Sequence, residues 1–243
     1  PAMEIAVALL NSARGDWHES HILHIQSVAV SIIARVSARV TPGAREQIAK
    51  LALTQLLLLI VNSPAAVQTV ADLALGNLAK DTPPVLALFS EVAGKRDKNR
   101  LKEIWSYLAT NQPHISHLAL LCLKDTLRSG YAREKLGKGD VGKSMRDSKV
   151  RTIVLQLQTN LQGGLAKERA QVAAEILTEI TACDDRLRRL AVETQVLQAC
   201  SIVLSSYGST VPVSLALAVL QLLHGLSAAD APGVSVPAPA AQL

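Results

Sequence analysis

The chain has 243 residues, of which 49% are hydrophobic and 19% charged, and its formal net charge is +5. The acidic residues are spread along the chain, so the positive balance is mild and allows an acidic partner without requiring one. No apolar run approaches the roughly 20 residues that a membrane-spanning helix needs.

Helical periodicity and turn residues predict antiparallel helices joined by short turns, hence an all-α fold. Ser63 is predicted to cap one helix and Pro64 to begin it. The longest polar stretch, residues 131–148, is predicted to be an exposed basic loop. The predicted helices span residues 2–10, 17–38 (a break near His24 being left open), 44–61, 64–79, 84–92, 99–110, 113–130, 150–161, 165–183, 185–205 and 212–227.

Five segments resemble one another as apolar helices rich in Ala and Leu. They recur at roughly 40- to 55-residue spacings, close to the range of stacked helical repeats. A helix pair of this kind cannot bury its apolar side alone, so neighbouring repeats are expected to share a continuous core. The segments are IQSVAVSIIARVSA from Ile25, VQTVADLALGNLAK from Val67, ISHLALLCLKDTLR from Ile115, QVAAEILTEITACD from Gln171 and VSLALAVLQLLHGLSA from Val213.

Two of these segments carry a family resemblance. LALGNLAK at Leu73–Lys80 resembles the third helix of an armadillo repeat, and AAEILTEITA at Ala173–Ala182 is similar to it. The resemblance extends to HEAT-like repeats. It implies an armadillo/HEAT-like α-solenoid, a right-handed superhelix whose third helices line a concave groove.

The groove ladder of peptide-binding armadillo proteins is absent. Only Asn77 matches the Asn position, and Leu73 stands where the Trp would be; the remaining Asn-equivalent positions hold Arg35, Asp125, Glu179 and Gly225. The resemblance therefore argues against recognition of extended basic peptides and favours a partner helix or folded domain. Arg35 and Asn77 are the candidate groove residues.

The segment Gly137–Ser144 (GKGDVGKS) matches the phosphate-loop pattern GxxxxGK[ST], in which Lys143 would reach the phosphates and Ser144 would bind magnesium. That chemistry needs a buried strand before the loop and a helix at the lysine. The residues before Gly137 lack apolar strand character, so we interpret the match as a Gly- and Lys-rich loop and keep nucleotide binding as an alternative.

Basic residues gather in two places, at 95–102 and 128–151. Both clusters could contact an acidic protein, or a phosphate backbone if they share one side, which makes nucleic-acid binding the first alternative. Within the predicted loop the candidate contacts are Arg133, Lys135, Lys138, Lys143 and Arg146.

Catalytic, cofactor and metal sites are not indicated. His18, His21 and His24 are spaced by three and do not converge as zinc ligands do. The three cysteines, Cys122, Cys183 and Cys200, stand far apart in helical patterns, which is typical of reduced thiols in the cytoplasm or nucleus.

The sequence therefore predicts a non-catalytic protein–protein interaction scaffold, part of a larger eukaryotic protein. Residues 1–3 are interpreted as a cloning remnant, 4–230 as the repeat domain, and 231–243 as a Pro- and Ala-rich disordered tail or linker. The predicted partner is another protein, either a helix or a folded domain, and an acidic partner is one of the alternatives. The high apolar content leaves self-association open.

Overall fold

A computed structural model describes residues 2–12, 19–94, 100–110, 112–128, 143–158, 162–183, 185–206 and 211–227. Regular secondary structure in these ranges is helical, apart from an isolated bridge residue at Val211, which confirms the all-α prediction. The chain forms two compact units. Unit 1 comprises Pro1–Ala132 with Gly163–Arg169, and unit 2 comprises Arg133–Gln162 with Ala170–Leu243.

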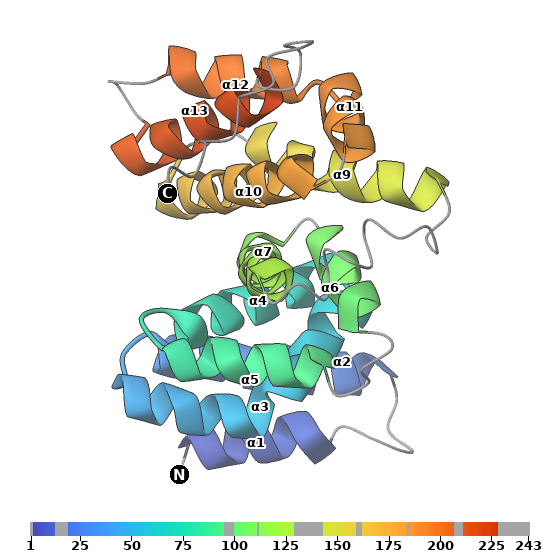
Figure 1. The fold of residues 1–243 in the computed structure, drawn as a ribbon. Helices are drawn as coiled ribbons and strands as arrows, with labels where there is room; N and C mark the ends of the chain where they lie inside the picture. Colours follow the sequence, from blue (N-terminus) through green and yellow to red (C-terminus); the bar gives the residue numbers. More distant parts are fainter. Residues whose placement is uncertain are drawn as a thin grey trace, which may run out of the picture. The chain divides into compact units, whose positions relative to one another are not determined.

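Successive helices make up each unit (Figure 1). Unit 1 contains α1 (Ala2–Ser12), α2 (Glu19–Ser37), α3 (Pro42–Asn62), α4 (Ala65–Ala79), α5 (Pro83–Gly94), α6 (Arg100–Leu108) and α7 (Pro113–Arg128). Unit 2 contains α9 (Lys143–Gln158), α11 (Asp185–Glu193), α12 (Val196–Ser205) and α13 (Val213–Ser227), and α10 (Gly164–Cys183) contributes residues to both units. None of these described helices is both long and apolar enough to cross a membrane.

The five similar segments form α2, α4, α7, α10 and α13. In unit 1, α4 packs extensively against both α2 and α3, and α7 packs against α6 and α4. The side chains between these helices are fully buried and aliphatic or aromatic, as expected for neighbours that share one core. They include Ile33, Leu56, Ile60, Leu75, Leu78, Ile115 and Leu123, together with Phe89 of α5, which also packs against α3, α4 and α7.

An arginine holds the ends of two stacked helices together. The guanidinium of Arg45, near the start of α3, donates from Nε to the Ser37 carbonyl (2.9 Å) and from Nη1 to the Lys80 carbonyl (2.7 Å). The last carbonyls of a helix have no partner within it and carry partial negative charge. Arg45 therefore satisfies the C-terminal ends of α2 and α4 at once, which places these ends side by side and makes the two helices run in the same direction.

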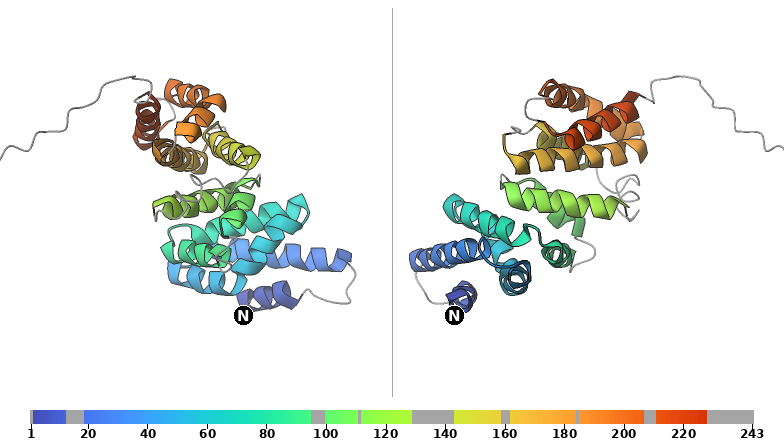
Figure 2. Two further views of the ribbon diagram at one scale, coloured as in Figure 1. Left: turned by 45° about the vertical axis from the view of Figure 1, so that its right-hand side comes forward. Right: turned by 90° about the vertical axis from the view of Figure 1, so that its left-hand side faces the viewer.

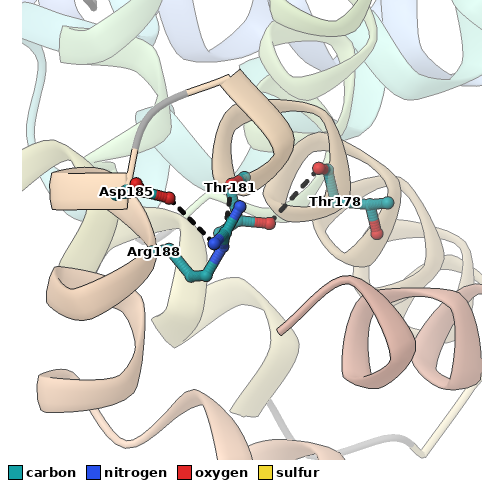
Figure 3. Close-up of polar contacts among 4 residues, drawn as sticks. All are labelled: Thr178, Thr181, Asp185 and Arg188. Atoms are coloured by element: carbon teal, nitrogen blue, oxygen red, sulfur yellow. Dashed lines mark hydrogen bonds and ion pairs between the residues drawn. The ribbon is translucent and has the colours of Figure 1, made fainter. Parts of the chain in front are cut away.

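The same device recurs in unit 2, at the end of α10 (Figure 3). Arg188 of α11 donates from Nε to the Thr181 carbonyl (3.2 Å) and pairs with Asp185 at 2.8 Å. The Thr181 hydroxyl in turn donates to the Thr178 carbonyl (3.2 Å). In both α2 and α10, the carbonyl of a Ser or Thr in the last turn thus accepts a hydrogen bond from an arginine of the next helix.

Two predicted boundaries near α2 and α4 need correction. Helix α2 is continuous through His24, so no break occurs there. Ser63 does not cap α4; it closes α3, its N–H donating to the Leu59 carbonyl, and Pro64 occupies the N-cap position of α4 without a side-chain hydrogen bond. The prediction gave Ser63 to the start of α4, whereas it belongs to the end of α3, because the two helices are joined by only two residues.

Two further differences lie in unit 2. Helix α9 begins at Lys143, so residues 143–148 are helical and the predicted loop is shorter than expected. The single helix predicted over 185–205 is two helices, α11 and α12, because Gln195 adopts a left-handed backbone with φ of 67°. A non-glycine residue in that region ends regular α-helix. Neither Gly nor Pro marks this break in the sequence.

Candidate binding surface

A partly apolar surface lies where α2 and α4 pack together. Val28 and Arg35, seven residues apart, lie on the same side of α2, and Leu73 and Asn77, four apart, share one side of α4. Val28 is 43% exposed, Leu73 is 48% exposed, and Arg35 is also exposed. We call these four residues the α2–α4 face.

Asn77 fixes the register of this face. Its side-chain Nδ2 donates to the Ala34 carbonyl of α2 at 2.9 Å, next to Arg35 in the chain. Leu73 precedes Asn77 by four residues and Val28 precedes Ala34 by six, so both lie within about 9 Å of this hydrogen bond along the helix axes. The two sequence-predicted residues, Arg35 and Asn77, are therefore brought together. Asn77 is half-buried and joins the two helices.

A buried carboxylate joins α4 to α7. Asp72 accepts backbone hydrogen bonds from His114 (3.0 Å to Oδ2) and Ile115 (2.8 Å to Oδ1), and so caps the first turn of α7 from another helix. Burial raises the pKa of Asp72, and the two N–H donors and the nearby cations only partly offset this effect. Sequence reasoning missed this role. Its signal was a single charge in an otherwise uncharged segment, 51–79.

Gly76 lets α7 approach α4 this closely. A Cβ at Gly76 would lie closer than 3.0 Å to the imidazole ring of His114. The start of α7 therefore lies against residues 72–76, in the second half of α4. The LALGNLAK motif thus places Leu73 on the surface and Gly76 against α7.

His117 lies near this junction and stays neutral at physiological pH. Burial, together with the positive charges of Arg169 and His114, lowers its pKa to about 4. The Glu168 carboxylate, 3.8 Å from Nε2, would favour the protonated ring. Its side chain is 66% exposed, however, so water screens its charge and the burial of the imidazole prevails.

This polar cluster offers no metal centre. No group of His, Cys, Asp and Glu side chains suited to a metal ion occurs among the residues that the structure describes. The positive charge of the buried Arg169 favours the ionised form of Asp72 and disfavours protonation of His117. The arrangement links helices and explains why charged groups occur inside unit 1.

Most of the predicted basic contacts cannot be placed. Arg133, Lys135 and Lys138 lie outside the described residues, as do residues 95–99 of the other cluster. Lys143 and Arg146 lie in the first turn of α9, but their side chains are not described. Lys149, further along α9, is partly buried, and burial lowers its pKa.

Two of the three cysteines, Cys122 and Cys200, have described side chains. Cys122 and Cys200 are buried and form no disulfide, and burial raises the pKa of the Cys200 thiol to about 11. A thiol with so high a pKa carries little thiolate at neutral pH, which makes it a poor nucleophile.

Comparison with known proteins gives similarity of fold alone. No protein-family model and no curated protein matches the sequence. Among solved structures, an engineered protein is 17% identical over 93% of this chain and 80% of its own, with a TM-score of 0.49. A designed armadillo repeat protein in complex with the peptide (KR)4 is 12% identical over 92% of this chain and 99% of its own, with a TM-score of 0.41. Computationally designed armadillo repeat proteins for modular peptide recognition give 13% identity, the same coverages and a TM-score of 0.41.

Proposed function

We propose that this chain is a non-catalytic scaffold domain in which the α2–α4 face binds a helix or folded domain of another protein, in the cytoplasm or nucleus. The observation that carries the proposal is the exposure of Val28 and Leu73 beside Arg35, on helices whose other sides are buried. An apolar centre with a charged and polar edge is the usual composition of a protein-binding surface.

The charges at one end of the face favour an acidic group on the partner. Arg35, Arg39 and Lys80 are exposed at or just after the C-terminal ends of α2 and α4, with Asp81 as the acidic neighbour. An amphipathic helix could place its apolar side on Val28 and Leu73 and a carboxylate near Arg35. Asn77, held by its hydrogen bond to Ala34, contributes a rigid surface beneath.

The test compares exposed residues of the two units, including two leucines of similar exposure. Leu73→Asp and Arg35→Glu change the α2–α4 face, and Leu155→Asp changes a leucine of α9 that is 53% exposed. The three variants and the parent chain are used to capture proteins from eukaryotic lysate, with and without nuclease treatment, and quantitative mass spectrometry is the readout.

A protein retained by the parent and by Leu155→Asp, but reduced at least tenfold by both face variants, is the expected outcome. A tenfold loss corresponds to about 1.4 kcal/mol, a modest value for a residue at the centre of an interface. Equal retention by all four chains would refute the assignment of the face. Loss of the whole captured set on nuclease treatment would instead favour the nucleic-acid alternative.

Nucleotide binding at Gly137–Ser144 remains a second candidate because α9 begins at Lys143, where the phosphate-loop mechanism requires a helix. Residues 137–142 lie outside the described part of the chain. The thermal midpoint with magnesium and ATP or GTP decides the matter. A rise that Lys143→Ala abolishes would favour this candidate, and an unchanged midpoint would exclude it.

A further inference from the structure

Helix α13 carries apolar residues on opposite sides, although Gln221 and His224 are also exposed. Leu215, Val219 and Leu222 are buried within unit 2. On the other side, Val213 is 60% exposed, Leu217 53% and Leu220 50%. A helix with large apolar side chains on opposite sides is normally covered on both, and at 15 residues α13 is too short to span a membrane. Its outer side therefore calls for a covering surface.

The neighbouring helix extends this apolar surface. Helix α12 packs against α13, and the two lie beside each other in both views of Figure 2. On α12, Leu197 and Ile202 are about half exposed; five residues apart, they lie on the two flanks of its outer side, with Gln198 and Ser201 between them. We call Leu197, Ile202, Val213, Leu217 and Leu220 the α12–α13 face.

The segment that carries this face has no formal charge. From Thr194 to Ala229 the sequence contains no Asp, Glu, Lys or Arg, although at the overall charged fraction of 19% it would hold about seven. The imidazole of His224, exposed in the last turn of α13, is the titratable group on this outer side. The α2–α4 face differs in this respect, because Arg35 belongs to it.

We propose that the α12–α13 face pairs with the same face of a second copy of this chain about a two-fold axis. In such an isologous contact the same patch of both copies forms the interface, and a residue on the axis meets its own copy. A charge near the axis would meet a like charge, so the centre of such a contact is expected to be neutral and apolar. A charged partner would have no opposite formal charge on this face to pair with.

The dimensions of the helix set the expected strength. Helix α13 is about 22 Å long and about 10 Å wide with its side chains. Its outer side alone is therefore small compared with the roughly 800 Å² that each partner buries in an interface of standard size. Even with α12 added, we expect a dimer that dissociates at micromolar concentrations.

Two other occupants are conceivable, and the test separates them from a second copy. One is the uncharged segment Ala231–Leu243 of the same chain. The other is the apolar side of α3 in another molecule, where Leu51, Leu58 and Val61 are exposed and residues 51–71 are also uncharged. That contact would be heterologous, and it would build open chains of molecules instead of a closed dimer.

The experiment measures mass by sedimentation equilibrium over a range of concentrations. Its variants are Leu217→Glu and Leu217→Lys, alone and as an equimolar mixture, with Leu58→Glu as the control at a similarly exposed leucine (47%). Circular dichroism checks that each variant keeps the helical content of the parent. Raising the salt concentration from about 0.1 to about 1 M tests the apolar nature of the contact.

We expect the parent and Leu58→Glu to approach twice the monomer mass, and each Leu217 variant alone to dissociate with a constant raised at least tenfold. The mixture should regain dimers, because opposite charges then face each other across the axis. Added salt should not weaken the parent dimer. A parent that stays monomeric would overturn the proposal, as would masses beyond the dimer, disruption by Leu58→Glu, or a mixture as dissociated as its components.

Discussion

The carboxylate of Asp72 provides the sharpest test of how unit 1 is held together. It is 2% exposed and accepts the N–H groups of His114 and Ile115, which have no acceptor within their own helix. Asp72→Ala leaves two buried donors unsatisfied, at about 1–3 kcal/mol each. It also removes the anion that faces Arg169.

We expect Asp72→Ala to lower the free energy of unfolding by about 3–5 kcal/mol, the usual cost of leaving a buried charge without its partner. Such a loss is a large part of the roughly 5–15 kcal/mol that stabilises an ordinary domain. Asp72→Asn should cost only about 1–2 kcal/mol, because it keeps one acceptor oxygen. Since burial already disfavours the ionised form of Asp72, loss of the charge is the smaller part of the effect.

Urea unfolding followed by far-ultraviolet circular dichroism measures these differences, with Asp125→Ala as a control at an exposed aspartate of α7. The control should stay within about 0.5 kcal/mol of the parent. The reasoning fails if Asp72→Ala also lies within about 1 kcal/mol of the parent, or if Asp72→Asn is as damaging as alanine.

Three further predictions concern other contacts between and within the helices. Because the pKa of His117 is lowered to about 4 from an ordinary 6.5, its neutral ring stabilises the fold above pH 6.5, and up to about 3 kcal/mol is lost as the pH falls from 6.5 to 4. His117→Gln should flatten that part of the pH–stability profile, and an unchanged slope would disprove it. Gly76→Ala should lower the thermal midpoint because its Cβ meets His114, and a second change, His114→Ala, should restore it; no recovery would contradict the contact. Arg188→Lys should cost about 1 kcal/mol of unfolding free energy, since lysine cannot make the paired contacts to Thr181 and Asp185; a neutral result in chemical denaturation would remove the role given to this arginine.

Periodicity in the sequence identified the helices and their buried sides because the rule behind it is local. Apolar residues repeat at the helical period, and Leu75 and Leu123, which lie in two of the five similar segments, are fully buried. Boundaries were predicted less well where one turn serves two helices, as at Ser63. The break at Gln195 was not predicted because a left-handed backbone is usually marked by glycine in a sequence, and this position holds glutamine.

The residues whose roles could not be predicted from the sequence are those that contact residues far away in the chain. Asp72 and His114 are far apart in the chain, and nothing local shows that a carboxylate in α4 caps the start of α7. The two arginines that close helix ends, Arg45 and Arg188, are equally invisible to periodicity. Each becomes meaningful only once the helix packing has placed a carbonyl within its reach.

The candidate binding surface was partly predictable. The armadillo resemblance pointed to Arg35 and Asn77, and the structure brings them together through the Ala34 carbonyl. It could not tell that Asn77 is itself engaged between helices, or that Val28 completes the face. The α12–α13 face was hidden for another reason, since an apolar helix looks the same in sequence whether one side or both sides are covered.

The most direct measurement places a photo-crosslinking amino acid at position 73 and, as a control, at position 155, and identifies the products formed in eukaryotic lysate. A binding role for the α2–α4 face predicts that position 73 captures a discrete protein that position 155 does not, and that Arg35→Glu suppresses the product. Equal products from both positions, or a product at position 73 that persists with Arg35→Glu, would contradict it.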